Sequence, residues 1–71
     1  MITLENIRIQ LIEAIKESGL SQTEIAKKLQ ITQPTVSDYL HGKSMPALDT
    51  FANLCEILDL DANEILCIRK N

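Results

Sequence analysis

The sequence predicts an all-α domain built from five short helices. Apolar residues recur at spacings of three and four along most of the chain, which is the spacing of one helical face. Residues that begin or end helices separate these stretches. Tyr39 and Phe51 are the only aromatic residues, so aliphatic side chains must fill the core. We expect residues 1–71 to form a single domain, because this length is too short for two.

The first predicted helix occupies the N-terminal stretch of the chain and ends before Gly19. Its apolar residues fall on one stripe: Leu4, Ile7, Leu11, Ile12, Ala14 and Ile15. Glycine is favoured directly after a helix, since it adopts a left-handed conformation without steric cost.

The second predicted helix begins at Ser21 and runs to about Leu29. Ser21 and Glu24 have the spacing of a capping box, in which each side chain accepts a hydrogen bond from the backbone amide of the other residue. Ile25, Ala26 and Leu29 would face inward, and the small Ala26 would let a neighbouring helix come close.

The third predicted helix begins after Thr32, which is a favourable N-cap residue. Pro34 falls in the first turn, where its missing N–H leaves no hydrogen bond unmade. Val36 and Leu40 are four residues apart and are expected to point inward together. Gly42 is expected to end the helix in a left-handed conformation.

Two further helices are predicted after a short loop that contains Pro46. The apolar face of the fourth helix is expected to consist of Leu48, Phe51, Ala52, Cys55 and Leu58. Asp61 and Glu64 form a second capping pair, which predicts a brief fifth helix through Ile65 and Leu66.

The third predicted helix turns polar residues outward. Gln33, Ser37 and His41 form one outer row, and Pro34 and Asp38 form another. Tyr39 is expected to fill the edge of the core rather than to stack on a base. Two short helices joined by three or four residues, the second exposing a polar row, have the geometry needed to enter a major groove. Many helical proteins share this pattern, so on its own it indicates only an all-helical domain.

The stretch from Gly19 to Leu66 resembles the lambda-repressor-like helix-turn-helix proteins, of the Cro/CI-type or XRE family. The residues that carry the resemblance are Leu20-Ser21-Gln22, Ala26 followed by Leu29, the run from Gln33 to Ser37, Gly42-Lys43 and Pro46. The resemblance implies a five-helix domain in which the second and third helices form the helix-turn-helix and the third is the recognition helix. It also implies a transcriptional regulator, expected to be a repressor, that binds double-stranded DNA and usually acts as a dimer on a two-fold operator.

With this resemblance, nine residues become candidates for DNA contact: Gln22, Thr32, Gln33, Pro34, Thr35, Ser37, Asp38, His41 and Lys43. Gln22 would bind a phosphate at the start of the second helix, and Gln33 would present its amide to adenine N6 and N7. The alternatives are a solvated glutamine at position 22 and a first-turn cap at position 33. Pro34, Thr35 and Ser37 would contact base edges or phosphates, although plain helix surface is an equal alternative for each.

The remaining candidates lie at the two ends of the third helix and in its outer row. Asp38 would accept a hydrogen bond from a cytosine N4 amine and so exclude other bases. The alternative is that Asp38 points away and pairs with a lysine. His41 and Lys43 match family positions that touch the DNA backbone, and Thr32 would contact it through its N–H or hydroxyl group.

Several positions depart from the family pattern. Ile15 and Leu40 stand where some members have an ion pair between the first and third helices, so we expect these two side chains to contact each other. Gln30 and Asp59 stand where glycine is frequent, and a positive φ would cost each of them about 1 kcal/mol. Ala47 replaces a frequent serine cap.

The net charge of −3 argues at first sight against DNA, because affinity for DNA comes largely from cations that neutralise phosphates. The distribution weakens that objection. Residues 21–43 carry Lys27, Lys28 and Lys43 against two acidic residues, whereas residues 44–71 carry only Arg69 and Lys70 against five. The acidic C-terminal half also supports an alternative function: an antitoxin or phage accessory protein whose main role is to bind a basic protein partner.

Other functional classes find little support in the sequence. The apolar runs are too short for a membrane span and the N-terminus lacks a secretion signal, so we expect a cytoplasmic protein without membrane association. Cys55, Cys67 and His41 form neither a metal-binding motif nor a nucleophile and base pair. We therefore expect no metal, no cofactor and no enzymatic activity. Without a separate dimerisation domain, a homodimer would form weakly off DNA, through Leu60, Ile65 and Ile68.

Overall fold

The computed structural model describes residues 1–68 and contains five helices in this range: α1 (Leu4–Glu17), α2 (Gln22–Leu29), α3 (Gln33–Leu40), α4 (Leu48–Ile57) and α5 (Ala62–Ile65). No strand occurs among these residues, so the predicted fold class is confirmed. The domain predicted over residues 1–71 includes Arg69, Lys70 and Asn71, which lie outside the described residues. No helix within residues 1–68 is long and apolar enough to cross a membrane.

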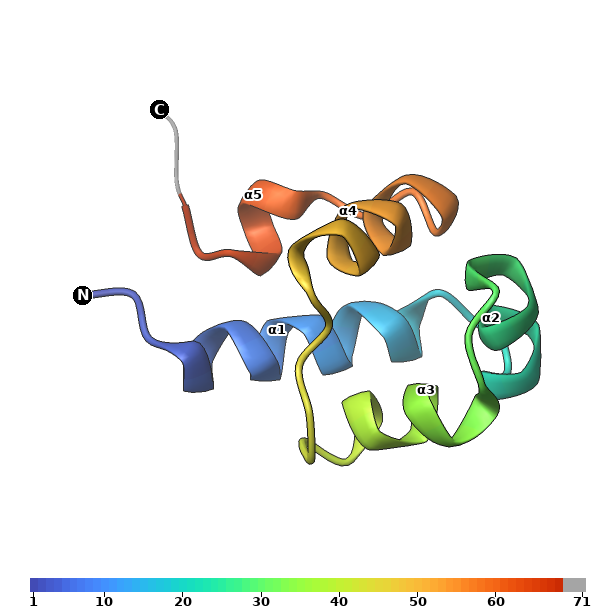
Figure 1. Cartoon of the computed structure of the whole chain (residues 1–71). Coiled ribbons are helices and arrows are strands. Elements are labelled where there is room, and N and C mark those ends of the chain that lie inside the picture. The colour runs from blue at the N-terminus through green and yellow to red at the C-terminus, as the bar shows by residue number, and fades with distance from the viewer. Residues whose placement is uncertain (69–71) are drawn as a thin grey trace.

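The five helices are arranged around α1. In Figure 1, α1 crosses the middle of the molecule, α3 runs below it, and α4 and α5 lie above it. Helix α2 packs against α3 at one end of this arrangement and also touches α4. Helix α1 therefore separates α3 from the C-terminal helices, and the two sides of the domain carry different surfaces.

The predicted helix starts are confirmed by their capping hydrogen bonds. Ser21 and Glu24 form the complete capping box of α2, with both reciprocal hydrogen bonds at 3.1 Å. The backbone N–H of Ser21 stabilises the charged Glu24 carboxylate and so lowers its pKa. The side chains of Thr32 and Asp61 cap α3 and α5. Helix α4 has no side-chain cap, because Ala47 occupies its N-cap position.

The core contains side chains from all five helices. Its buried members are Leu11, Ile15, Ile25, Ala26, Val36, Tyr39, Leu54 and Ile65. The inward positions predicted for α2 are buried at Ile25 and Ala26, while Leu29 is half-buried and packs against them. Because the side chains on the inner side of α3 pack in the core, the opposite side of the helix faces outward.

The predicted inner face of α3 is confirmed and is wider than expected. Val36 is fully buried and Leu40 is half-buried against the core, as predicted. Tyr39, which was expected at the edge of the core, is one of its buried residues. The Tyr39 side chain retains 7% exposure, and this burial, followed by the charge of Asp49, raises the pKa of its phenol. Ile15 is buried and Leu40 packs against the same core, and their direct contact stays a prediction.

The predicted face of α4 was partly wrong. Phe51, Cys55 and Leu58 are half-buried and pack against the core, as predicted. Leu48 keeps 86% exposure and Ala52 is exposed, whereas Leu54, which was not predicted, is completely buried. The buried face of α4 is therefore rotated around the helix toward Leu54. Packing against α2 and the core decides which face turns inward, and the apolar Leu48 lies outside that contact.

Within residues 1–68, three residues other than glycine adopt the left-handed backbone conformation: Gln30 at φ 57°, Asp59 at φ 54° and Cys67 at φ 61°. The sequence singled out Gln30 and Asp59 as positions where glycine is frequent, and it gave no sign of this conformation at Cys67. Gln30 is the C-cap of α2, where its N–H and that of Ile31 bond the last carbonyl groups of the helix. The side chain of Gln30 thus adds steric strain without contributing to the turn itself.

Replacing Gln30 with glycine is expected to stabilise the protein by roughly 0.5–1 kcal/mol, because glycine adopts positive φ without a Cβ clash. Urea denaturation measures the change in the free energy of unfolding. Lys28→Gly is the matched control, since Lys28 is exposed in the helical part of α2 and should lose about 1 kcal/mol. Equal destabilisation by both substitutions would contradict the strain at Gln30.

Candidate nucleic-acid interface

Helices α2 and α3 form a tight helix-turn-helix unit. The left-handed Gln30 ends α2, the Ile31 N–H donates to the Ala26 carbonyl oxygen at 3.0 Å, and Thr32 begins α3. Ala26 and Val36 are both buried where these helices pack. The small side chain of Ala26 permits this close approach, as the sequence predicted. The unit therefore fixes the orientation of α3 and leaves its polar side on the surface.

Gln22 and Gln33 are joined across the start of the two helices. The Gln33 amide Nε2 donates a hydrogen bond to the Gln22 side-chain oxygen. This bond leaves both N–H groups of the Gln22 amide free to donate, and leaves Gln33 with its oxygen and one N–H. The sequence identified both glutamines separately but not their pairing, since they are eleven positions apart.

Thr32 and Thr35 also form a pair in the first turn of α3. Their hydroxyl oxygens are 2.7 Å apart, and the Thr35 N–H donates to the Thr32 hydroxyl oxygen at 3.4 Å. Thr32 thus caps the helix while remaining exposed, and Thr35 is half-buried. Pro34 lies between them and is exposed. The first turn of α3 consequently presents a rigid surface of hydroxyl groups, a proline ring and the Gln33 amide.

Ser37 and His41 continue the outer row one turn further along α3. His41 Nδ1 donates to the Ser37 carbonyl oxygen at 2.8 Å and lies 3.2 Å from the Ser37 hydroxyl oxygen. These contacts orient the imidazole and place its hydrogen on Nδ1, so Nε2 is the nitrogen that remains for an outside partner. His41 is exposed and Ser37 is half-buried.

Asp38 and Lys43 meet through the backbone at the end of α3. The Lys43 N–H donates to the Asp38 carbonyl oxygen at 2.9 Å, and Gly42 turns the chain with φ 72°. Lys43 is exposed and Asp38 is half-buried. Asp38 forms no salt bridge with a lysine among residues 1–68, where the ion pair joins Arg8 to Glu5.

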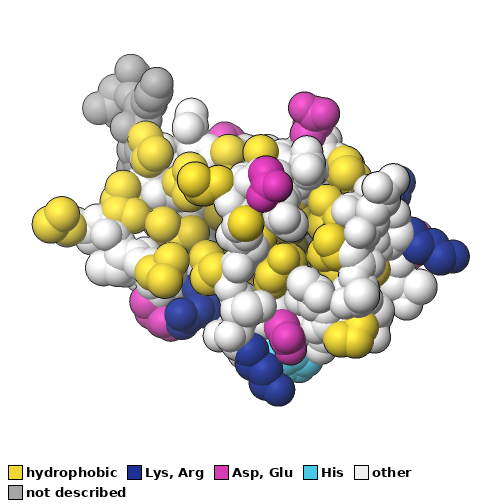
Figure 2. All heavy atoms as spheres, in the orientation of Figure 1, with side chains coloured by type: hydrophobic (Ala, Val, Ile, Leu, Met, Phe, Trp, Pro, Cys, Tyr) yellow, Lys and Arg dark blue, Asp and Glu magenta, His cyan; other side chains and the backbone are white. Residues whose placement is uncertain are grey.

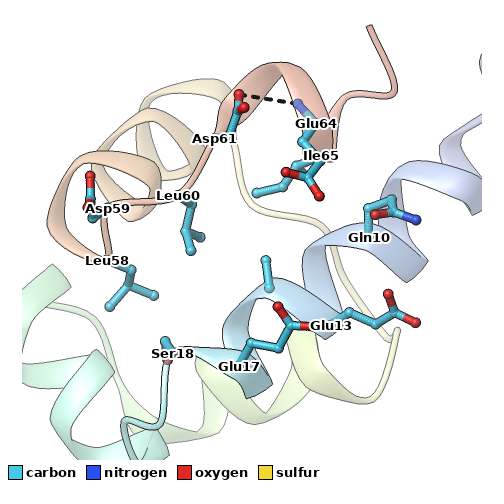
Figure 3. Close-up of a pocket in the computed structure, with 11 residues that line it drawn as sticks. Gln10, Glu13, Glu17, Ser18, Leu58, Asp59, Leu60, Asp61, Glu64 and Ile65 are labelled. Atoms are coloured by element: carbon cyan, nitrogen blue, oxygen red, sulfur yellow. Dashed lines mark hydrogen bonds between the residues drawn. The ribbon is translucent and has the colours of Figure 1, made fainter. Parts of the chain in front are cut away.

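The charges are distributed unevenly around the domain. Lys27 and Lys28 are exposed at the end of α2, and Figure 2 shows basic side chains there and along the edge below α3. An acidic groove of about 400 Å³ lies on the other side of α1, as Figure 3 shows. Its acidic lining residues are Glu13, Glu17, Asp59, Asp61 and Glu64. The groove is remote from the outer row of α3. The acidic side chains that line the groove therefore lie far from that row.

The predicted dimer surface was partly wrong. Ile65 has only 3% exposure and belongs to the core, and Leu60 is half-buried against it. Ile68 is exposed, as are Ile2, Leu4 and Leu48. Leu4 and Leu48 border an apolar hollow of about 190 Å³, lined also by Ile7, Met45, Pro46, Phe51 and Leu66. Figure 2 shows hydrophobic side chains gathered on this face.

The chain is similar in sequence to a known family and to several known proteins. The sequence profile of the helix-turn-helix family matches residues 11–65, which include all of α2, α3, α4 and α5. The ImmF control region 10 kDa protein of Bacillus phage phi105 is 35% identical over 48 residues, which are 68% of this chain and 53% of that protein. The antitoxin HipB of Escherichia coli K12 is 35% identical over 66 residues, which are 87% of this chain and 73% of HipB. HipB of the CFT073 strain matches over the same length and with the same identity.

The chain thus spans about half the length of the phage protein. No solved structure matches it.

Proposed function

We propose that this chain, which belongs to the lambda-repressor-like helix-turn-helix family of DNA-binding regulators, represses transcription by binding a two-fold operator as a homodimer. The observation that carries the proposal is the polar outer side of α3, whose side chains are ordered by Gln22, Thr32 and the end of the helix. An ordered row of hydrogen-bonding groups on an exposed helix is suited to base edges in a major groove.

The proposed contacts fall into two groups along α3. Gln33, Pro34, Thr35, Ser37 and Asp38 would face base edges, with Gln33 opposite an adenine and Asp38 opposite a cytosine amine. Gln22, Thr32, His41 and Lys43 would bind the sugar-phosphate backbone on either side of the groove. The backbone contacts would fix the position of the helix, and the base contacts would supply sequence preference.

A second candidate function is supported by a different observation. Both HipB relatives are named antitoxins, and the acidic groove is an ordered surface of the opposite charge to a basic protein. In this alternative the chain binds a protein partner through its acidic C-terminal half, either instead of DNA or in addition to it. The two functions predict different behaviour toward duplex DNA.

Selection of bound duplexes from a random pool, followed by a salt titration, tests the proposal. We expect an enriched two-fold site whose half-sites lie about 34 Å apart or a multiple of that distance. Affinity for it should fall steeply between low and moderate salt, because phosphate contacts release counterions. No affinity for duplex DNA at either salt concentration would refute DNA binding and favour the protein-partner function.

Replacing Asp38 with asparagine is expected to raise affinity for random duplexes by about 2- to 5-fold, because it removes a carboxylate that repels phosphates. Discrimination in favour of the selected site should fall at the same time, since the exclusion of non-cytosine bases is lost. Fluorescence anisotropy with both duplexes measures the two effects. Asp49→Asn, which removes an exposed carboxylate from the first turn of α4, is the matched control and should leave discrimination unchanged.

A further inference from the structure

Arg8 of α1 packs against the turn that follows α3. A Cβ atom added to Gly42 would lie 3.1 Å from Arg8 Cδ and 3.8 Å from Arg8 Nε. Gly42 directly follows His41, the C-cap of α3, and precedes Lys43. The absence of a side chain at Gly42 therefore leaves room for Arg8, in addition to permitting the φ of 72°.

The Arg8 guanidinium has few hydrogen-bond partners among residues 1–68. Nε is covered and has no partner, and Nη1 donates to the Glu5 carboxylate. Within residues 1–68 Glu5 is the only hydrogen-bond partner of this side chain, although a guanidinium carries five N–H donors. The side chain still has 28% exposure, so part of it reaches solvent. An arginine ordered in this way is unusual for one that serves only the fold, since buried polar groups are normally satisfied.

The position of Arg8 brings a third basic side chain to the end of α3. Gly42 lies between His41 and Lys43, so packing against Gly42 places Arg8 beside these two exposed residues. Figure 2 shows the histidine together with basic side chains along the edge below α3. Arg8 from α1 therefore lies at the turn whose neighbouring positions carry His41 and Lys43.

We propose that Arg8 binds a backbone phosphate of DNA at the end of α3, next to the contacts made by His41 and Lys43. This inference rests on the proposed DNA-binding function. The planar guanidinium matches two phosphate oxygens, and a side chain already ordered against Gly42 loses little freedom on binding. The contact fixes α1 to the DNA backbone and carries no base preference.

Glu5 acts as the partner of Arg8 in the absence of DNA. Its side chain is 64% exposed, and an exposed pair three residues apart on a helix contributes little to stability. A phosphate can therefore replace the carboxylate at the guanidinium. Glu5 would then face the phosphate as a like charge, so it opposes binding.

Arg8→Gln tests the proposal in the full chain, with the selected site and a random duplex as probes. We expect affinity for both duplexes to fall by about 5- to 10-fold at low salt and the slope of log affinity against log salt to become shallower by about 0.9. Arg8→Lys should keep most of the slope and lose less affinity, because it keeps the charge but not the planar fork. Glu5→Gln should bind both duplexes about 2- to 5-fold more tightly.

Lys16→Gln is the matched control, because Lys16 is an exposed cation in the last turn of α1, at the other end of the helix. It changes the net charge equally and should leave the slope unchanged. Thermal denaturation of each variant confirms that it is folded. A wild-type slope in Arg8→Gln, or an equal loss in Lys16→Gln, would overturn the inference while leaving DNA binding intact. Absence of salt-dependent affinity in the unmodified protein would instead refute the proposed function itself.

Discussion

Leu54→Ala is expected to destabilise the protein by roughly 2–5 kcal/mol, since it removes a large side chain from a completely buried position. A domain of 71 residues buries a small core and has a total stability toward the lower end of about 5–15 kcal/mol. The cavity left by Leu54→Ala would therefore remove a large part of the free energy of unfolding. We expect the melting temperature, followed by circular dichroism, to fall by at least about 10 °C.

Leu48→Ala is the matched control for this prediction, because it makes the same substitution in the same helix. Leu48 retains 86% exposure, so the change in the free energy of unfolding should stay within about 0.5 kcal/mol. A comparable loss of stability in the two variants would show that α4 packs with a different face inward.

The contrast between Leu48 and Leu54 also shows where sequence analysis fails. The helix starts at Ser21, Thr32 and Asp61 could be predicted because their capping hydrogen bonds join residues only two or three positions apart. Helix α4 lacks such a cap, and its apolar residues are numerous enough to define two overlapping faces. Contact with other helices selects between these faces, and that contact depends on residues distant in the sequence.

The same distinction applies to the candidate site. The outer row of α3 follows from helical periodicity, so Gln33, Ser37 and His41 could be placed on one side from the sequence. The bond between Gln22 and Gln33 depends on the angle between two helices, and the packing of Arg8 against Gly42 depends on how α1 crosses the end of α3. Neither the angle between α2 and α3 nor the crossing of α1 over the end of α3 can be read from the spacing of residues along the chain. These cross-helix contacts are also the ones that order the site.

Gln33→Ala is expected to produce the largest change in DNA recognition. Loss of a bidentate contact with adenine should reduce discrimination for that base pair by roughly 1–3 kcal/mol, which is about 5- to 150-fold. Affinity for random duplexes should hardly change, because the glutamine contributes no charge. Competition binding with duplexes that differ at a single base pair measures the effect. Equal affinity losses on all duplexes would contradict base recognition by Gln33 and indicate a structural or backbone role.

The hydrogen bond between Gln22 and Gln33 predicts that a substitution at Gln22 affects recognition of the same base pair. Gln22→Ala removes the acceptor that orients the Gln33 amide, so it should weaken discrimination at the same base pair as well as the proposed phosphate contact. The double variant should then lose less than the sum of the single losses, because the Gln33 contact can be lost only once. Additive losses would mean that the two side chains act independently on DNA. In that case the order that α2 imposes on α3 would come from the packing of Ala26 and Val36 alone.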